Sequence, residues 1–163
     1  LEAEGQYRFF ADADLSVPIE TINPFLARLE EGFDVAIGTR AKPGAIVEMH
    51  QPMYREFMGK VFTALSNWIL GLQISDFTCG WKGFCRDAAV DGFILQLLTN
   101  WTFDSEVLFL AKLRKYKVIE IPVRWRNDRE TKVRLWRDVI PSFLGLLQIR
   151  LYAYRRRYQR VER

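Results

Sequence analysis

The sequence predicts an α/β fold, and three segments near its start carry that prediction. An apolar run at 7–11 ends in acidic residues and is expected to form a buried strand. Ser16 and Pro18 form a helix-start signal, so a helix is expected from Ile19 to Glu31. A second apolar run, 34–39, is the next expected strand. This β-α-β order predicts a parallel pair of strands joined by a crossover helix.

The remaining elements are expected in chain order from hydrophobic spacing and turn residues. They are a mobile loop at 41–52, a helix at 54–70, a turn-rich segment at 75–84, helices at 87–98 and 103–116, and a strand at 118–125. The last strand contains Pro122, which cannot donate to a neighbouring strand, so this strand is expected at a sheet edge.

The C-terminal segment from Val133 to Tyr154 has a broad apolar surface with arginines at both ends. The apolar residues are Leu135, Trp136, Val139, Ile140, Phe143, Leu144 and Leu147, and the arginines are Arg134, Arg137, Arg150 and Arg155 to Arg157. This pattern predicts a helix lying in a membrane interface. A helix packed on the protein body with a solvated basic end is the alternative. We therefore divide the chain into a body, residues 1–132, and basic amphipathic helices, residues 133–163.

Charge is distributed unevenly along the chain. Residues 1–123 contain 12 Lys/Arg and 16 Asp/Glu, whereas residues 124–163 contain 12 Lys/Arg and 4 Asp/Glu. A basic tail indicates an anionic partner. Its apolar neighbours favour an anionic membrane surface, and no nucleic-acid partner is expected. No apolar run reaches the ~20 residues that a spanning helix needs.

Histidine and cysteine chemistry is not expected. His50, the only histidine, lies in a polar stretch and is predicted to be a surface residue. Cys79 and Cys85 are predicted to be buried thiols, with a disulfide as the alternative. Neither cysteine has a nearby base, so neither is expected to be a nucleophile.

Asp12 and Asp14 are the candidate metal ligands. Two carboxylates separated by one residue at a strand end can reach one hard cation, and Mg²⁺ and Mn²⁺ prefer oxygen ligands. A nucleotide diphosphate supplies further oxygens, and the metal offsets the charge that builds on the leaving diphosphate. The alternative for Asp14 is a helix N-cap.

Several segments resemble, in order and spacing, the family 2 inverting glycosyltransferases of the GT-A fold, and most closely the polyprenyl-phosphate sugar synthases. The resembling segments are Phe9 to Pro18, Gly38-Thr39-Arg40, Arg55 with Gly59 and Phe62, Asp76 to Phe84, Phe103 to Leu108, Ile121 to Trp125 and Lys132-Val133. The 76–84 segment is similar to that of the glucose branch. The resemblance implies the C-terminal part of a GT-A domain, followed by amphipathic juxtamembrane helices.

The resemblance also implies the reaction and its partners. A hexose, glucose in the first instance, passes from UDP-glucose (or from GDP-mannose, as in the mannose branch) to a polyprenyl phosphate of the dolichyl type. The transfer is inverting and depends on Mg²⁺ or Mn²⁺. The family begins with a half that holds the nucleotide base, and no segment of this chain resembles that half. A silent fragment that binds anionic membrane or a partner chain is therefore the alternative function.

The resemblance assigns roles to the remaining candidates. Asp104 and Arg40 are expected in the catalytic site, Arg40 as a phosphate partner or, alternatively, in a surface salt bridge. The acceptor phosphate is expected to contact Arg55, Arg129 and Lys132, each of which could equally be a solvated charge.

The turn containing Gly80 and Lys82 is expected where sugar and acceptor meet, because Gly80 permits a close backbone approach. The expected location is the cytoplasmic face of a membrane, held peripherally. A homo-oligomer is left open.

Overall fold

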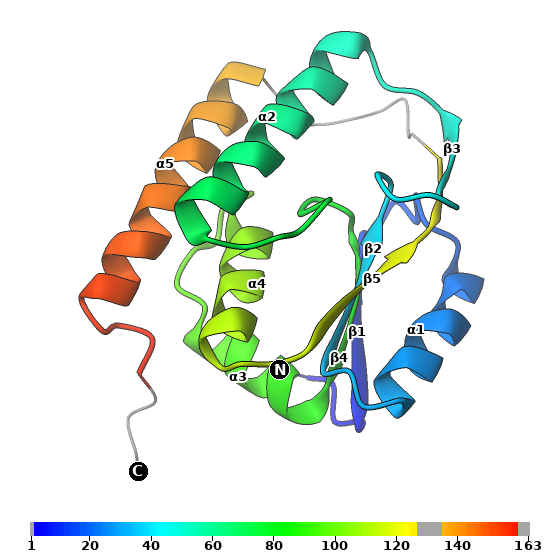
Figure 1. Ribbon diagram of the computed structural model, residues 1–163, viewed down its shortest axis with the longest axis horizontal. Helices are drawn as coiled ribbons and strands as arrows, with labels where there is room; N and C mark the ends of the chain where they lie inside the picture. The colour runs from blue at the N-terminus through cyan, green and yellow to red at the C-terminus, as the bar shows by residue number, and fades with distance from the viewer. Residues whose placement is uncertain (1, 127–134, 160–163) are drawn as a thin grey trace.

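The computed structural model describes residues 2–126 and 135–159. The strands are β1 (Tyr7–Ala11), β2 (Val35–Thr39), β3 (Ile46–Met49), β4 (Trp81–Cys85), β5 (Val118–Pro122) and β6 (Arg124–Arg126). The helices are a 3-10 turn η1 (Ile19–Thr21), α1 (Ile22–Glu30), α2 (Met53–Leu70), α3 (Arg86–Leu95), α4 (Phe103–Leu113) and α5 (Leu135–Tyr154). Figure 1 shows a layered α/β arrangement, as the sequence predicts.

The main sheet has the order β1-β4-β2-β5. Strand β4 is antiparallel to both β1 and β2, while β2 and β5 are parallel. The expected pairing of the first two strands is therefore wrong. The two strands run in the same direction, but β4 lies between them. Strand β4 comes from a later part of the chain and forms hydrogen bonds with both.

Strand β4 lies in a segment that was expected to be turn-rich. Its sequence includes Lys82 and Gly83, which argue against a buried strand when they are read alone. Lys82 is tolerated inside the protein because an aspartate pairs with its ammonium group. Gly83 leaves room for the ring of Phe9 on β1, which would meet any larger side chain there.

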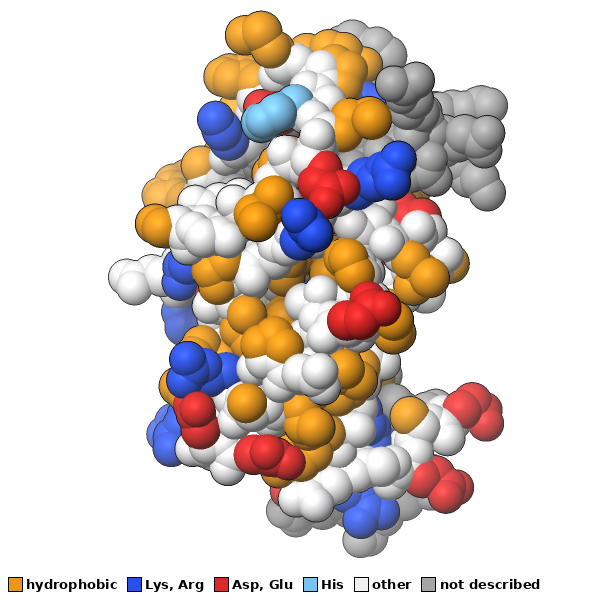
Figure 2. All heavy atoms as spheres, turned by 90° about the vertical axis from the view of Figure 1, so that its right-hand side faces the viewer, with side chains coloured by type: hydrophobic (Ala, Val, Ile, Leu, Met, Phe, Trp, Pro, Cys, Tyr) orange, Lys and Arg blue, Asp and Glu red, His pale blue; other side chains and the backbone are white. Residues whose placement is uncertain are grey.

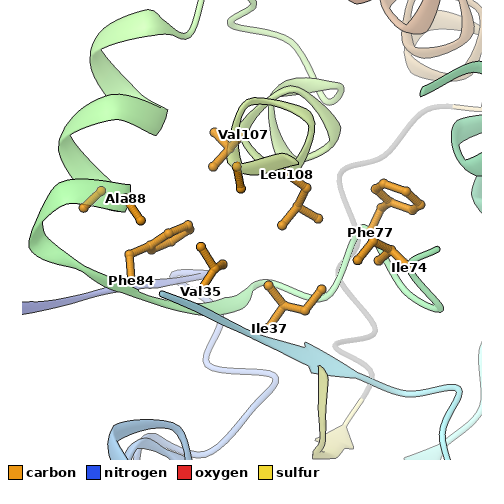
Figure 3. Packing of buried hydrophobic residues seen from close by; sticks show 10 residues of the cluster. Val35, Ile37, Ile74, Phe77, Phe84, Ala88, Val107 and Leu108 are labelled. Carbon is orange, nitrogen blue, oxygen red and sulfur yellow. The ribbon is translucent and has the colours of Figure 1, made fainter. Parts of the chain in front are cut away.

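Helices cover both faces of the sheet (Figure 1). Helix α1 lies on one face, and α3 and α4 lie on the other. Figure 3 shows the core between β2, β4 and the helices α3 and α4, where Val35, Ile37 and Phe84 meet Val107 and Leu108. All five residues of β2 are buried, as expected for a central strand covered on both sides.

Outside this core, the expected strand at 118–125 divides into β5 and β6. Strand β5 is an edge of the main sheet, which confirms the prediction based on Pro122. Strand β6 leaves that sheet and pairs in parallel with β3. The expected loop at 41–52 therefore contains a short strand. The helices predicted at 54–70, 87–98 and 103–116 are confirmed, with ends that differ by at most three residues.

Helix α5 packs beside α2, and the two run along the same side of the molecule (Figure 1). Leu146 and Ile149 are buried in a cluster shared with α2 and α4. On the outer face, Ile140, Leu144 and Leu147 are exposed. Helix α5 thus packs on the body on one side and presents an apolar face on the other. The structure does not describe the side chains of Leu135, Trp136 and Val139, which the sequence predicts on this apolar surface. Within the described part of the chain, no helix is both long and apolar enough to cross a membrane.

Candidate functional site

The acidic turn that follows β1 rests against the start of β4. Ala11 pairs with Trp81, so the next residue, Asp12, comes to lie beside Gly80. The Asp12 amide donates to the Gly80 carbonyl at 3.0 Å. A methyl group at position 80 would overlap the Asp12 carboxylate. Gly80 is therefore required for the close approach of the Asp12 carboxylate.

The same turn has a second hydrogen-bonded support. Asp14 accepts a hydrogen bond from the Ser16 amide at 2.9 Å, which closes a local turn and leaves the side chain at the surface. The Ser16 carbonyl accepts from the Arg126 amide of β6 at 2.9 Å. The turn is thus fixed between β4 on one side and β6 on the other, and both aspartates lie on it.

Lys82 and Asp104 form an ion pair inside the protein. The Lys82 side chain is only 2% exposed, and its Nζ lies 2.6 Å from Asp104 Oδ1. The same ammonium donates to the Cys79 carbonyl at 2.6 Å. Asp104 lies in the first turn of α4. The pair therefore connects α4 with the 79–82 segment, and Lys82 is an internal residue that supports the site.

Arg40 and Asp76 form a second pair with fork geometry. Arg40 donates through Nε and one terminal nitrogen to the two Asp76 oxygens at 2.7 and 2.8 Å. The guanidinium group also donates to Thr78 Oγ1 and lies 5.0 Å from the ring centre of Trp125. Burial opposes the charge of Arg40, but the hydrogen bond and charge of Asp76 outweigh it and raise the pKa of Arg40. Arg40 stays charged, and Asp76 binds the guanidinium edge formed by Nε and one terminal nitrogen.

The electrostatics around Asp12 favour a cation. Desolvation raises the pKa of Asp12, and the nearby carboxylates of Asp104 and Asp14 raise it further, while Lys82 and Arg40 act in the opposite direction. Burial likewise raises the pKa of Asp104, although Lys82 partly offsets it. Two neighbouring carboxylates thus repel the charge of Asp12, and added positive charge would relieve this repulsion.

A small hollow of about 10 Å³ lies next to Asp12 and has room for about one water-sized group. It is lined by Asp12, Ser16, Val17, Gly80, Trp81 and Trp125. Within the described residues, the buried indole N–H of Trp81 has no hydrogen-bond partner. The hollow has room for a single hydroxyl or water beside Asp12.

Three further residues are predicted to contact the acceptor phosphate. Arg55 lies in the first turn of α2, 5.9 Å from the ring centre of Tyr54. Arg129 and Lys132 lie outside the described residues. The structure thus joins Asp12, Gly80, Lys82 and Asp104 by direct contacts or electrostatic coupling, with Arg40 and Asp14 alongside.

The cysteines and the histidine lie outside any disulfide or metal cluster of the described residues. Both cysteines are free thiols; Cys79 is buried and Cys85 partly so. Burial raises the pKa of Cys79 to about 11, so it is a neutral thiol near pH 7. His50 is on the surface, paired with Glu56, and is visible in pale blue in Figure 2. The face in Figure 2 mixes acidic, basic and hydrophobic side chains, without a patch of one charge.

Asp76 and Glu106 are the important residues to which the sequence assigned no definite site. Asp76 stands in the segment that carries the family resemblance, so that segment was the signal for it. Glu106 lies two residues after Asp104 on α4, and the two carboxylates have different partners. Asp104 faces Lys82, while Glu106 accepts the amides of Leu97 and Leu98.

Asp12 and Asp14 fit a divalent metal only with help from a ligand. Among the described residues, no group of three or more His, Cys, Asp or Glu side chains could hold a metal ion. The two aspartates supply oxygen donors alone, which suits Mg²⁺ or Mn²⁺, and a diphosphate has the oxygens that would complete the coordination. The carboxylate repulsion at Asp12 agrees with such a use.

Comparison with known proteins decides the family. Residues 1–93, more than half of the chain, match the model of glycosyl transferase family 2. The chain belongs to this family. It is 28% identical over 158 residues to a dolichyl-phosphate beta-glucosyltransferase of Trichomonas vaginalis, an alignment that covers 93% of this chain and 46% of the relative.

Two further relatives extend this result. A dolichyl-phosphate beta-glucosyltransferase of Saccharomyces cerevisiae is 30% identical over 166 residues, which cover 93% of this chain and 49% of the relative. A polyprenol monophosphomannose synthase of Mycolicibacterium smegmatis is 30% identical over 131 residues, which cover 75% and 46%. The chain spans about half the length of these relatives.

Proposed function

We propose that the protein transfers a hexose, glucose in the first instance, from a nucleotide diphosphate sugar to a polyprenyl phosphate. The proposal rests chiefly on one observation, the placing of Asp12 against Gly80 beside the Lys82–Asp104 pair. Membership of glycosyl transferase family 2 supports the reaction class. The names of the relatives support a lipid phosphate as the acceptor. They also support glucose as the transferred sugar, with mannose as the second candidate.

The chemistry requires little from the protein beyond positioning and charge. An oxygen of the lipid phosphate attacks the anomeric carbon from the side opposite the nucleotide. The new carbon–oxygen bond forms as the bond to the nucleotide diphosphate breaks, and the configuration inverts. The phosphate acceptor is ionised near pH 7, given a second pKa of about 6, so no general base has to remove a proton. This agrees with a site rich in Asp, Arg and Lys.

Each residue of the site has a role in this proposal. Asp12 and Asp14 would hold the Mg²⁺ or Mn²⁺ ion, which, when bound, offsets the charge on the leaving diphosphate. Lys82 holds Asp104 in place and lowers the repulsion that Asp104 exerts on Asp12. Arg40, fixed by Asp76, adds a permanent positive charge near the diphosphate. Outside these contacts, Arg55, Arg129 and Lys132 stay candidates for the acceptor phosphate.

The outer face of α5 supports a lipid surface as the place of reaction. Ile140, Leu144, Leu147 and Leu151 are exposed at intervals of four, three and four residues, which places them on one side of the helix. Helix α2 lies beside it and exposes Phe57 and Trp68. Arginines 155–157 follow at the basic end of α5. We propose that this face contacts the anionic, cytoplasmic surface of a membrane, where a polyprenyl phosphate is available.

Donor binding by calorimetry with Mn²⁺ tests the proposal. We expect UDP-glucose to bind with micromolar affinity and Asp14→Asn to abolish binding, since Asp14 is exposed and its loss leaves the fold intact. Asp87→Asn, an exposed aspartate in the first turn of α3, is the matched control and should bind as wild type. Unchanged donor binding in Asp14→Asn would remove this residue from the site. No donor binding in any version would support the alternative of a silent membrane-binding or partner-binding fragment.

A second experiment tests the acceptor. The protein is mixed with labelled UDP-glucose and vesicles that contain a polyprenyl phosphate, and labelled lipid is extracted. Transfer that requires the phosphorylated polyprenol, and is not seen with free polyprenol, supports the reaction. Faster transfer from GDP-mannose than from UDP-glucose would assign the protein to the mannose branch.

A further inference from the structure

Helix α5 packs against the start of α4, the helix that carries Asp104, and is hydrogen-bonded to it. Thr102, immediately before α4, is fully buried, and its hydroxyl donates to the Ser142 carbonyl of α5 at 3.1 Å. Gly145 of α5 faces the same threonine so closely that a methyl group there would overlap its side chain. The backbone of α5 therefore contacts the residue that begins α4.

A second contact between α4 and the C-terminal part of the chain lies one turn further along α4. Glu106 is completely buried, and its carboxylate accepts the Leu98 amide at 2.8 Å and the Tyr158 hydroxyl at 2.6 Å. Tyr158 follows α5 in the chain and is 6% exposed. Its ring packs edge-on against Phe109 of α4. The chain beyond α5 thus folds back and covers a charged side chain of α4.

The two residues at the start of α4 that make these contacts flank Asp104 in the sequence. Thr102 is two residues before it and Glu106 is two residues after it. Asp104 in turn contacts Lys82, which contacts the Cys79 carbonyl next to Gly80. A continuous series of packed and hydrogen-bonded groups therefore runs from α5 to the acidic turn at Asp12.

We propose that α5 and Tyr158 form a brace that positions Asp104 in the site, so that the geometry of the site depends on how α5 is seated. In this role Thr102, Glu106 and Tyr158 are positioning residues that act through Asp104. The inference rests on the proposed function for its effect on sugar transfer. The brace itself follows from the contacts of α4 and α5. Because α5 also carries the exposed apolar face, the brace joins the proposed lipid-facing surface to the acidic turn.

Two substitutions disturb the brace from different sides. Tyr158→Phe removes only the hydroxyl that Glu106 accepts. Gly145→Ala adds one methyl group against Thr102, while alanine is itself favourable within a helix. Tyr7→Phe on β1 and Gln148→Ala on an exposed part of α5 are the matched controls.

Amide hydrogen exchange tests the brace without any substrate. We expect the Leu97, Leu98 and Glu106 amides to exchange about fivefold to tenfold faster in both brace variants, as the loss of about one hydrogen bond predicts. Amides of the central strand β2 should exchange at the wild-type rate, which separates a local effect from general unfolding. Both controls should match the wild type throughout.

Turnover then tests whether the brace positions Asp104. At a temperature well below unfolding we expect kcat to fall severalfold in both brace variants, with KM for the donor nearly unchanged. Folded variants with wild-type exchange at Glu106 would overturn the brace. Faster exchange with wild-type kcat would overturn its positioning role. If no version transfers sugar, the proposed function fails, and the exchange result still decides the brace.

Discussion

Lys82 Nζ and Asp104 Oδ1 lie 2.6 Å apart in the interior, and this pair joins the 79–82 segment to the first turn of α4. Burying two charges costs desolvation free energy, and only their mutual attraction offsets this cost. Lys82→Met should therefore destabilise the protein by about 3–5 kcal/mol, because it leaves the Asp104 carboxylate buried without its partner. Urea unfolding measures this change, with Lys60→Met on the exposed face of α2 as the control.

The double variant Lys82→Met/Asp104→Leu checks the reason for that loss. It removes both charges, so most of the lost stability should return even though the site is destroyed. If the double variant is as unstable as the sum of the single variants, packing and not charge pairing accounts for the effect of Lys82.

Gly80→Ala should abolish metal-dependent donor binding. The added methyl group takes the position of the Asp12 carboxylate, so this side chain must move away from its place beside β4. Calorimetry with Mn²⁺ and UDP-glucose measures the loss. Gly59→Ala in α2 is the matched control, since a methyl group there meets nothing within 4 Å. Wild-type donor affinity in a folded Gly80→Ala protein would contradict the placement of Asp12 in the site.

Asp12→Asn should raise stability at pH 7 while it removes donor binding. Desolvation and the charges of Asp104 and Asp14 raise the pKa of Asp12 in the folded protein, so its ionised form is disfavoured on folding. Since Asp12 is only partly buried, screening limits the gain to about 0.2–1 kcal/mol. The gain should shrink as pH falls through the raised pKa of the folded state. It should vanish below the unfolded value of about 3.9.

Thermal unfolding of the wild type and Asp12→Asn between pH 4 and pH 8 measures this difference. Asp87→Asn serves again as the control, because this aspartate lies at the exposed start of α3. A stability gain for Asp12→Asn that is constant with pH would show that the carboxylate charge is not its cause.

The site could be predicted from the sequence to the extent that it depends on neighbours in the chain. The acidic pair at the end of an apolar strand marked the Asp12–Asp14 turn, and the segment from Asp76 to Phe84 marked its counterpart. The roles of Lys82 and Arg40 could not be predicted in the same way. Each is paired with an aspartate more than twenty residues away, and no local pattern reports which charges will neutralise each other.

By itself the sequence determined the α/β class, most helices, the edge position of β5 and the position of the acidic turn after the first strand. These depend on hydrophobic periodicity and turn residues, which act over a few positions. Only the tertiary structure decided that β4 lies between β1 and β2, that Lys82 is buried against Asp104, and that α5 packs on α4 with one face and exposes the other. These features depend on contacts between residues that are far apart in the sequence. Strand order and buried charge pairs are therefore fixed only when the whole core packs.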